Sequence, residues 1–126
     1  MKISVIVTSF NSEKFLKFSI NSILSQTHQD FEIIIVDDCS KDKTREIINK
    51  FQKKDKRIKA ILLKKNTGTA AIPRNIGAKL AKSKYLCWFR SFFNCALFFY
   101  VFYCFRYSFA VSQRSQWRQP GNLKNI

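Results

Sequence analysis

Acidic residues are scarce in this chain of 126 residues, and they stop early. Eight Asp and Glu residues stand against 23 Lys and Arg residues, which gives a formal net charge of +15. No acidic residue follows Asp55. The remainder of the chain therefore offers no carboxylate that could hold a metal ion or act as a general base.

The chain also has almost no histidine, no closely paired cysteines and none of the common glycine-rich phosphate-binding motifs. The only histidine is His28, and no C-x-x-C pair occurs among the four cysteines Cys39, Cys87, Cys95 and Cys104. This pattern supports neither a zinc site nor a disulfide framework, so we expect a reduced, cytoplasmic setting. The motifs G-x-x-x-x-G-K-[ST] and G-x-G-x-x-G are absent, which argues against P-loop and dinucleotide-binding Rossmann sites.

Long hydrophobic runs are absent as well. No signal-peptide pattern precedes the first β-branched run, which begins at Ile3. The uncharged, aromatic-rich run 91–105 is bounded by Arg90 and Arg106. At about fifteen residues it is shorter than the roughly twenty that a spanning helix needs. We therefore expect no transmembrane helix, and contact with the inner face of a membrane stays open as an alternative.

The positive charge is scattered rather than gathered into one patch. Basic residues between 41 and 59 are interrupted by Asp42, Glu46 and Asp55, as on the solvated face of a helix. Attraction to anionic lipid headgroups or to phosphate-bearing substrates is the alternative interpretation. We do not expect a nucleic-acid partner.

The first ninety residues alternate between strand-like and helix-like patterns. Apolar, β-branched runs predict strands at 3–7, 31–36, 58–63 and 85–89. Apolar residues at helical spacing predict helices that follow Asn11 or Ser12, that span 42–53 after a cap at Ser40, and that span 74–81 with Pro73 in the first turn. This alternation predicts an α/β fold with a mostly parallel sheet, whose ligands bind beyond the carboxyl ends of the strands. The aromatic-rich residues that follow, and the polar residues 112–126, show neither period.

Polar residues cluster after the first two strands. The turn Thr8-Ser9-Phe10-Asn11-Ser12 offers hydroxyls, an amide and, we expect, free backbone N–H groups that attract anions and sugars. The second turn contains Asp37 and Asp38 after an apolar strand. Either one acid caps the next helix and the other is solvated, or a carboxylate accepts hydrogen bonds from a base or a ribose. Cys39 stands where a tight turn would suit glycine.

Later residues carry similar alternatives. Asn66, Thr67 and Gly68 are turn residues that could also contact a ligand. Arg74 lies at the start of a predicted helix, where a cation opposes the helix dipole unless an anion is near. Arg74 is therefore either solvated or a partner of a diphosphate.

The order of these motifs is more specific than any one of them. The chain contains Ile-Ser-Val-Ile-Val-Thr-Ser-Phe-Asn, Ser-Ile-Leu-Ser-Gln-Thr, Ile-Ile-Ile-Val-Asp-Asp-Cys-Ser-Lys-Asp, and Asn66 followed by Arg74-Asn75-Ile76-Gly77-Ala78. In this order they resemble the family 2 glycosyltransferases, which are inverting enzymes of the fold called GT-A. The resemblance covers about residues 1–88 and implies a Rossmann-like GT-A nucleotide-binding half.

The resemblance also implies an activity and a set of site residues. The activity is sugar transfer from a nucleotide-sugar, a UDP-sugar in many members, to a glycan or lipid-linked acceptor in surface polysaccharide synthesis. Thr8 matches a contact to the nucleoside, Phe10 an aromatic lying against the base, and Asp38 the carboxylate that recognises uracil. Asn66 and Arg74 match further contacts to the nucleotide.

The chain departs from the family after the fourth predicted strand. The family carries an Asp-x-Asp or Asp-Asp motif there, which holds Mg²⁺ or Mn²⁺, and a later acidic catalytic base. Here Phe89 is followed by Arg90-Ser91-Phe92-Phe93, with no acid. We therefore assign no catalytic residue and no metal ligand. We divide the chain into a nucleotide-sugar-binding region, 1–89, and an aberrant aromatic-rich tail, 90–126, and expect an incomplete, inactive transferase.

A truncation or a shifted reading frame would explain this departure. Phe89-Arg90-Ser91 can be encoded by TTT-AGA-TCN, and the frame one nucleotide later contains TTA-GAT, which encodes Leu-Asp. An acidic motif would begin in that way, so we hypothesise a disruption after about residue 89.

Two other functions are alternatives to the transferase. Ile-Ile-Val-Asp-Asp resembles the acidic pocket of receiver-like signalling domains, but receivers place the acid pair after the first strand, and here it follows the second. A membrane-surface interaction protein, using the aromatic tail and the basic face, is the other alternative.

Overall fold

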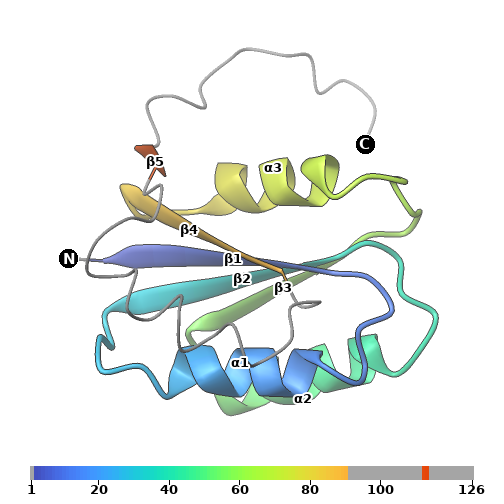
Figure 1. Ribbon diagram of the computed structural model, residues 1–126, viewed down its shortest axis with the longest axis horizontal. Helices are drawn as coiled ribbons and strands as arrows, with labels where there is room; N and C mark the ends of the chain where they lie inside the picture. Colours follow the sequence, from blue (N-terminus) through green and yellow to red (C-terminus); the bar gives the residue numbers. More distant parts are fainter. Residues whose placement is uncertain (1, 91–111, 114–126) are drawn as a thin grey trace.

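The computed structural model describes residues 2–90 and 112–113 (Figure 1). Its centre is a sheet with the strand order β3-β2-β1-β4-β5. The strands are β1 (Ile3–Ser9), β2 (Phe31–Asp37), β3 (Ile58–Leu62), β4 (Tyr85–Arg90) and β5 (Ser112–Gln113). The first four are mutually parallel, and β5 pairs antiparallel with β4. The predicted α/β fold with a mostly parallel sheet is confirmed.

Helices cover both faces of this sheet. α1 (Leu16–Leu24) and α2 (Thr44–Lys54) lie on one face, and α3 (Ala71–Leu80) lies on the other (Figure 1). Because each helix links two parallel strands, every connection is a crossover that runs from the carboxyl end of one strand to the amino end of the next. The turns that precede the helices therefore gather at one edge of the sheet.

Each face of the sheet has its own apolar core. Successive side chains of a strand point to opposite faces. Val5, Val7, Ile33 and Ile35 accordingly pack with α1 and α2, in a cluster that also contains Leu16, Ile20 and Ile48. Ile6, Ile34 and Val36 pack beneath α3 with Ala78 and Leu86. All seven residues of β2 are buried, which explains its nearly continuous apolar sequence.

α3 approaches the sheet closely at Gly77. A Cβ atom at this position would lie 2.5 Å from Cγ2 of the fully buried Ile6 and 3.4 Å from Cγ2 of Val36. No real Cβ tolerates the shorter distance. The glycine of the Arg-Asn-Ile-Gly-Ala motif thus permits helix–sheet contact rather than an unusual backbone angle.

A buried polar cluster lies at the opposite, amino-terminal edge of the sheet. Glu32 accepts hydrogen bonds from Ser4 Oγ at 2.7 Å, Lys59 Nζ at 2.7 Å and the backbone N–H of Lys82 at 2.8 Å. Burial acts to raise the pKa of Glu32, but the bonds from Lys59, Ser4 and Lys82 outweigh it and lower the pKa to about 2. The cluster ties β1, β2 and β3 to the turn before β4.

All three predicted helix starts differ from those in the structure. α1 begins at Leu16, after a turn in which Phe15 N and Leu16 N both donate to Ser12 O. α2 begins at Thr44, and Ser40 does not cap it, because Ser40 Oγ donates to Asp37. α3 begins at Ala71, earlier than predicted, with Pro73 in its first turn as expected.

β5 is an addition to the predicted strands. Gln113 pairs with Tyr85 and Ser112 with Leu86. Two residues are too few to show a period in the sequence. Our other predictions for the tail concern residues 91–111 and 114–126, which lie outside the described part of the chain. Within the described residues, no helix has the length and apolar character needed to cross a membrane.

Candidate functional site

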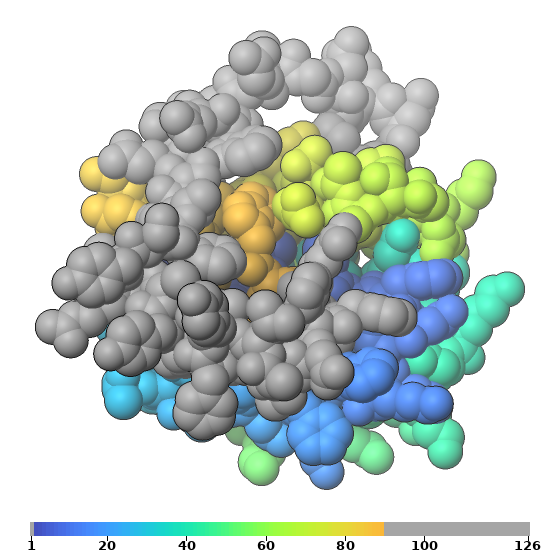
Figure 2. All heavy atoms as spheres, viewed as in Figure 1, coloured from blue at the N-terminus to red at the C-terminus, as the bar shows by residue number. Residues whose placement is uncertain are grey.

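The carboxyl ends of the strands carry the polar turns. Strand order changes direction at β1, which has β2 on one side and β4 on the other. Such a switch point is where open parallel sheets bind their ligands. Side chains of the segments that follow β1, β2 and β3 project together at the right-hand edge of the face in Figure 2.

The first two of these turns are clasped together by hydrogen bonds. Asn11 N donates to Ser40 Oγ at 2.9 Å, and Lys41 N donates to Asn11 Oδ1 at 3.0 Å. Ser12 N donates to Thr44 Oγ1 at 2.8 Å. The backbone N–H groups of Asn11 and Ser12 are therefore hydrogen-bonded within the protein. The prediction that the first turn has free N–H groups is wrong for these two residues.

Glu13 and Asp42 extend the clasp in both directions. Glu13 N donates to Asp42 Oδ2 at 3.1 Å, and Lys43 N donates to Glu13 Oε2 at 3.0 Å. Burial acts to raise the pKa of Asp42, but hydrogen bonds from Thr44 and from the backbone of Glu13 hold it below its ordinary value. The side chains of Glu13 and Asp42 thus each accept a hydrogen bond from the backbone of the opposite turn, and these bonds fix the two turns relative to each other.

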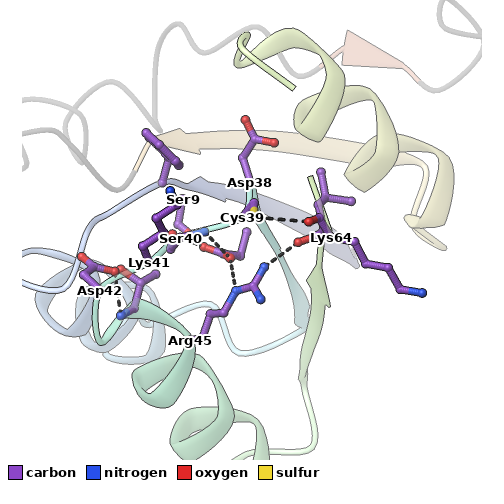
Figure 3. A network of polar contacts seen from close by, with 12 residues as sticks. Ser9, Asp38, Cys39, Ser40, Lys41, Asp42, Arg45 and Lys64 are labelled. Atoms are coloured by element: carbon purple, nitrogen blue, oxygen red, sulfur yellow. Dashed lines mark hydrogen bonds and ion pairs between the residues drawn. The ribbon is translucent and has the colours of Figure 1, made fainter. Parts of the chain in front are cut away.

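Asp37 is a structural brace beneath the turns. Its side chain is fully buried and accepts hydrogen bonds from Arg45 Nε at 2.9 Å, from Ser40 N at 3.0 Å and from Ser9 Oγ at 3.3 Å, besides the bond from Ser40 Oγ (Figure 3). Arg45 also donates to the backbone oxygen of Leu63. A buried carboxylate with a cation and several donors is satisfied, so Asp37 has no capacity left for a ligand.

Asp38 points away from this brace. Figure 3 shows its carboxylate directed away from Arg45, although the two acids are adjacent in the sequence. Thr67 N donates to Asp38 Oδ1 at 2.9 Å, and Thr67 Oγ1 donates to Asp38 Oδ2 at 3.0 Å. Asn66 Nδ2 donates to Asp38 O at 3.2 Å. The fold therefore brings together two predicted site residues, Asp38 and Asn66, through the loop before α3.

Left-handed backbone angles shape these turns. Asn11 has φ 44° and Cys39 has φ 62°, and both are non-glycine residues. Asn tolerates this region, whereas a side chain such as that of Cys is strained there. The prediction that Cys39 occupies a glycine-like position is confirmed. Its Sγ lies 3.4 Å from the backbone oxygen of Lys64, so the residue also joins the β2–α2 turn to the next loop.

The remaining predicted residues lie around the same edge. Thr8 is the penultimate residue of β1, and Phe10 follows the strand with 46% of its surface exposed. Arg74 lies in the first turns of α3, and its guanidinium stands over the ring of Trp88, 5.5 Å from the ring centroid. Our sequence reasoning missed Trp88. An aromatic residue near the end of the strand beside the switch point was the available signal.

The carboxylates at this edge do not fit a divalent metal ion. Asp37 is paired with Arg45, so of the acid pair only Asp38 has acceptor positions left after its bonds from Thr67. In residues 2–90 and 112–113, no three His, Cys, Asp or Glu side chains lie close enough together to hold an ion. No acidic residue follows β4 in the sequence. We therefore derive no chemical step through a metal from these residues.

Comparisons with known proteins point to one family. The sequence model described as Glycosyl transferase family 2 matches residues 4–90. The chain is 39% identical over 88 residues to the poly(ribitol-phosphate) beta-N-acetylglucosaminyltransferase TarS of Staphylococcus aureus, covering 68% of this chain and 15% of TarS. It is 42% identical over 84 residues to the glycosyltransferase GlyG of Streptococcus pneumoniae, covering 67% of this chain and 28% of GlyG.

Solved structures give the same result. Residues 1–349 of S. aureus TarS in complex with UDP match with a TM-score of 0.67 and 38% identity, over 72% of this chain and 27% of that one. The same region with UDP-GlcNAc matches with a TM-score of 0.67 and 33% identity, over 84% and 32%. A mannosyltransferase of Pyrobaculum calidifontis, in complex with GDP-Man and Mn²⁺, is 17% identical with a TM-score of 0.64 over 71% and 27%, which shows the shared fold.

These matches decide between the alternatives. The chain spans less than a third of the length of TarS or GlyG. The receiver-like alternative finds no support, since the acid pair follows β2 and its first member is bound in the ion pair with Arg45. The order of motifs, the Rossmann-like sheet and the match over residues 4–90 agree, and the chain belongs to glycosyltransferase family 2.

Proposed function

We propose that this chain binds the nucleotide of a sugar donor, with uracil as the base, at the carboxyl ends of β1 and β2. The observation that carries this proposal is the Asp38 carboxylate. It is only 7% exposed, points away from the Arg45 ion pair and is held by Thr67. Two solved structures of one relative, TarS, contain UDP or UDP-GlcNAc, which supports the choice of base.

The chemistry of Asp38 suits an imide group. An ionised carboxylate has about four lone-pair positions, and Thr67 uses two of them. The remaining acceptor capacity matches the N3–H donor of uracil, whereas cytosine carries an acceptor at the same ring position. The half-exposed ring of Phe10 would then lie against the base, and Thr8 would contact the nucleoside.

Arg74 and Asn66 complete the proposed contacts. The guanidinium of Arg74 stands over the Trp88 ring at the start of α3, where it would pair with the diphosphate. Asn66 lies beside Asp38 and would contact the nucleotide with the amide hydrogen that the bond to Asp38 O leaves over.

The whole enzyme to which such a region belongs would transfer the sugar to a glycan or lipid-linked acceptor in surface polysaccharide synthesis. The named activity of TarS, which acts on poly(ribitol-phosphate), supports this class of acceptor. A nucleotide-activated donor and a lipid-linked acceptor fit a cytoplasmic location at the inner face of the membrane. Mg²⁺ or Mn²⁺ would serve the family reaction, but the residues at this edge do not fit the ion.

Isothermal titration of the full chain with UDP tests the proposal. Asp38→Ala should weaken UDP binding by roughly 1.5–3 kcal/mol, the value of a hydrogen bond to a charged group. Asp38→Asn is the sharper variant, because the Asn oxygen can still accept from Thr67 N while the amide NH2, which can only donate, would donate to Thr67 Oγ1 instead of accepting from it. Asp30→Asn, at the opposite edge before β2, is the matched control and should bind like the wild type. Equal UDP affinity in the wild type and both Asp38 variants would exclude Asp38 from the site.

A further inference from the structure

We propose that Thr67 is a positioning residue that sets the orientation of the Asp38 carboxylate and thereby the preference of the site for one class of base. The inference rests on the proposed function, since it assumes that Asp38 faces the base. It concerns a residue that is not itself assigned a contact to the ligand.

Thr67 holds both oxygens of the carboxylate. Its backbone N–H donates to Asp38 Oδ1 at 2.9 Å, and its hydroxyl donates to Asp38 Oδ2 at 3.0 Å. One bond would leave the carboxylate free to rotate about its χ2 torsion, which is a broad and weakly restricted angle. Two donors from one residue fix the plane of the group instead.

The hydroxyl of Thr67 has one proton and two acceptors. Thr67 Oγ1 also lies 3.0 Å from the backbone oxygen of Thr69. Since a hydroxyl carries a single O–H donor, it divides this proton between Asp38 Oδ2 and Thr69 O. Asp38 therefore has one undivided bond, from the backbone N–H of Thr67, and one from a hydroxyl that Thr69 O also holds in place.

The loop that carries Thr67 is itself held in place. Asn66 Nδ2 donates to Asp38 O at 3.2 Å, and Gly68 N donates to Asn66 Oδ1 at 2.6 Å. These two bonds fix the orientation of the Asn66 amide, because one end must donate and the other must accept. Gly68 has φ 71°, an angle that glycine adopts without strain. Thr67 thus sits between two residues that restrict its backbone.

A fixed carboxylate discriminates between bases by their ring nitrogen. Uracil presents N3–H, which the carboxylate accepts, and cytosine presents a bare N3, which leaves the carboxylate facing another acceptor. A site built to accept a hydrogen bond rejects a ligand that lacks the donor, because a buried polar group is then left unpaired. A carboxylate that can rotate would turn away from cytosine and would discriminate less.

The test is titration of the full chain with UDP and with CDP. Thr67→Val removes the hydroxyl while keeping the shape of the side chain and the backbone N–H. It should lower UDP affinity and the ratio of UDP to CDP affinity, each by a factor of about ten, the worth of one hydrogen bond to a charged group. Thr67→Ser restores the hydroxyl and should restore the ratio. Ser25→Ala removes a hydroxyl that bonds a backbone oxygen at the end of α1, and should change neither value.

The outcomes separate this inference from the proposed function. If Asp38→Asn weakens UDP binding but Thr67→Val leaves the ratio unchanged, Thr67 has no positioning role and the inference fails alone. If the wild type shows no preference for UDP and Asp38→Asn has no effect, both fail. Thr67→Ala serves as the second variant should Thr67→Val not fold, as judged by its circular dichroism spectrum, and the same loss of ratio is expected.

Discussion

Asp37 and Asp38 are adjacent in the sequence, and their side chains meet different surroundings. Asp37 is fully buried and paired with Arg45, eight residues along the chain. Asp38 is bound by Thr67, 29 residues along the chain, on the other side of β3. The side-chain alternation of an extended strand end separates the two carboxylates, so one supports the turn and the other faces the site.

We predict that the same substitution destabilises the fold far more at Asp37 than at Asp38. Asp37→Asn should lower the free energy of unfolding by about 2–4 kcal/mol, because an amide has one acceptor where the native group has two and leaves Arg45 and Ser40 partly unpaired. Asp38→Asn should lower it by less than about 1 kcal/mol. Urea unfolding of both variants measures the difference, and equal losses of stability would contradict the division of roles.

The residue pattern alone predicted the acid pair as a candidate and left the two roles open, and the family resemblance assigned the contact to the base to Asp38. The partners that decide it, Arg45 and Thr67, are brought in by tertiary contacts that no local pattern encodes. The glycine-like position of Cys39 could be predicted, because a tight turn has a local requirement. The stacking of Arg74 on Trp88 could not, since it depends on how α3 lies across β4.

At the scale of elements, α3 is fitted to the sheet through Gly77. We predict that Gly77→Ala lowers the free energy of unfolding by about 1–3 kcal/mol through overpacking against the buried Ile6 methyl. Gly68→Ala is the informative comparison. There a Cβ atom meets nothing within 4 Å, so its cost of about 1–2 kcal/mol arises from the left-handed φ alone.

An additional substitution distinguishes the two causes. Ile6→Ala removes the methyl group that the new Cβ would meet, so it should reduce the cost of Gly77→Ala and leave that of Gly68→Ala unchanged. Guanidinium unfolding of the single and double variants supplies the coupling energies. Additive effects at Gly77 and Ile6 would show that the close approach does not limit the packing of α3.

The buried Glu32 cluster makes the stability of the sheet depend on pH. The pKa of Glu32 is about 2 in the fold and 4.5 ordinarily. Its contribution, roughly 2–3 kcal/mol, is fully present above pH 4.5 and is lost as the pH falls toward 2. Glu32→Gln should therefore be less stable than the wild type at pH 6, and the gap should close below about pH 3. Urea midpoints across this range test it; a gap independent of pH would place the effect in packing.

The number, type and order of the elements in residues 1–89 were predictable, and the three helix starts were not. Strands and helices follow from periodic apolar residues, which a core on each face requires. The starts of α1 and α2 were missed because the side chains of Asn11 and Ser40 bond across the two turns instead of capping their own helices. Capping rules assume that a side chain bonds to the backbone of its own helix. Here these side chains bond to groups of the neighbouring turn instead.

At the scale of the whole molecule, charge and composition divide the chain near the end of β4. All eight acidic residues lie at or before Asp55, and the family match ends at residue 90. The division of the chain after residue 89 stays a prediction. Whether a shifted reading frame caused the change stays a hypothesis, and the nucleotide sequence of the locus, read in all three frames beyond codon 89, tests it.

The last prediction concerns the metal ion and turnover. A divalent cation strengthens nucleotide-diphosphate binding when protein carboxylates share it with the phosphates. This chain has no acid after Asp55, and at the strand ends Asp37 is paired with Arg45, so Asp38 would have to hold the ion without Asp37. We therefore expect Mn²⁺ to change the UDP affinity of the full chain by less than about threefold. The same absence of a carboxylate base leaves an acceptor hydroxyl without a proton acceptor, so the chain should release no UDP from a UDP-sugar.

Titration with UDP in the presence of Mn²⁺ or of a chelator measures the first effect, and a coupled assay for released UDP measures the second. A full-length family member with the acidic motif is the positive control for both measurements. A tenfold or larger gain in affinity with Mn²⁺ would mean that the chain binds the ion through groups other than those described at the strand ends. UDP release above the rate without protein would show that the chain contains a group that can deprotonate the acceptor. The chain would then catalyse a reaction as well as bind the nucleotide.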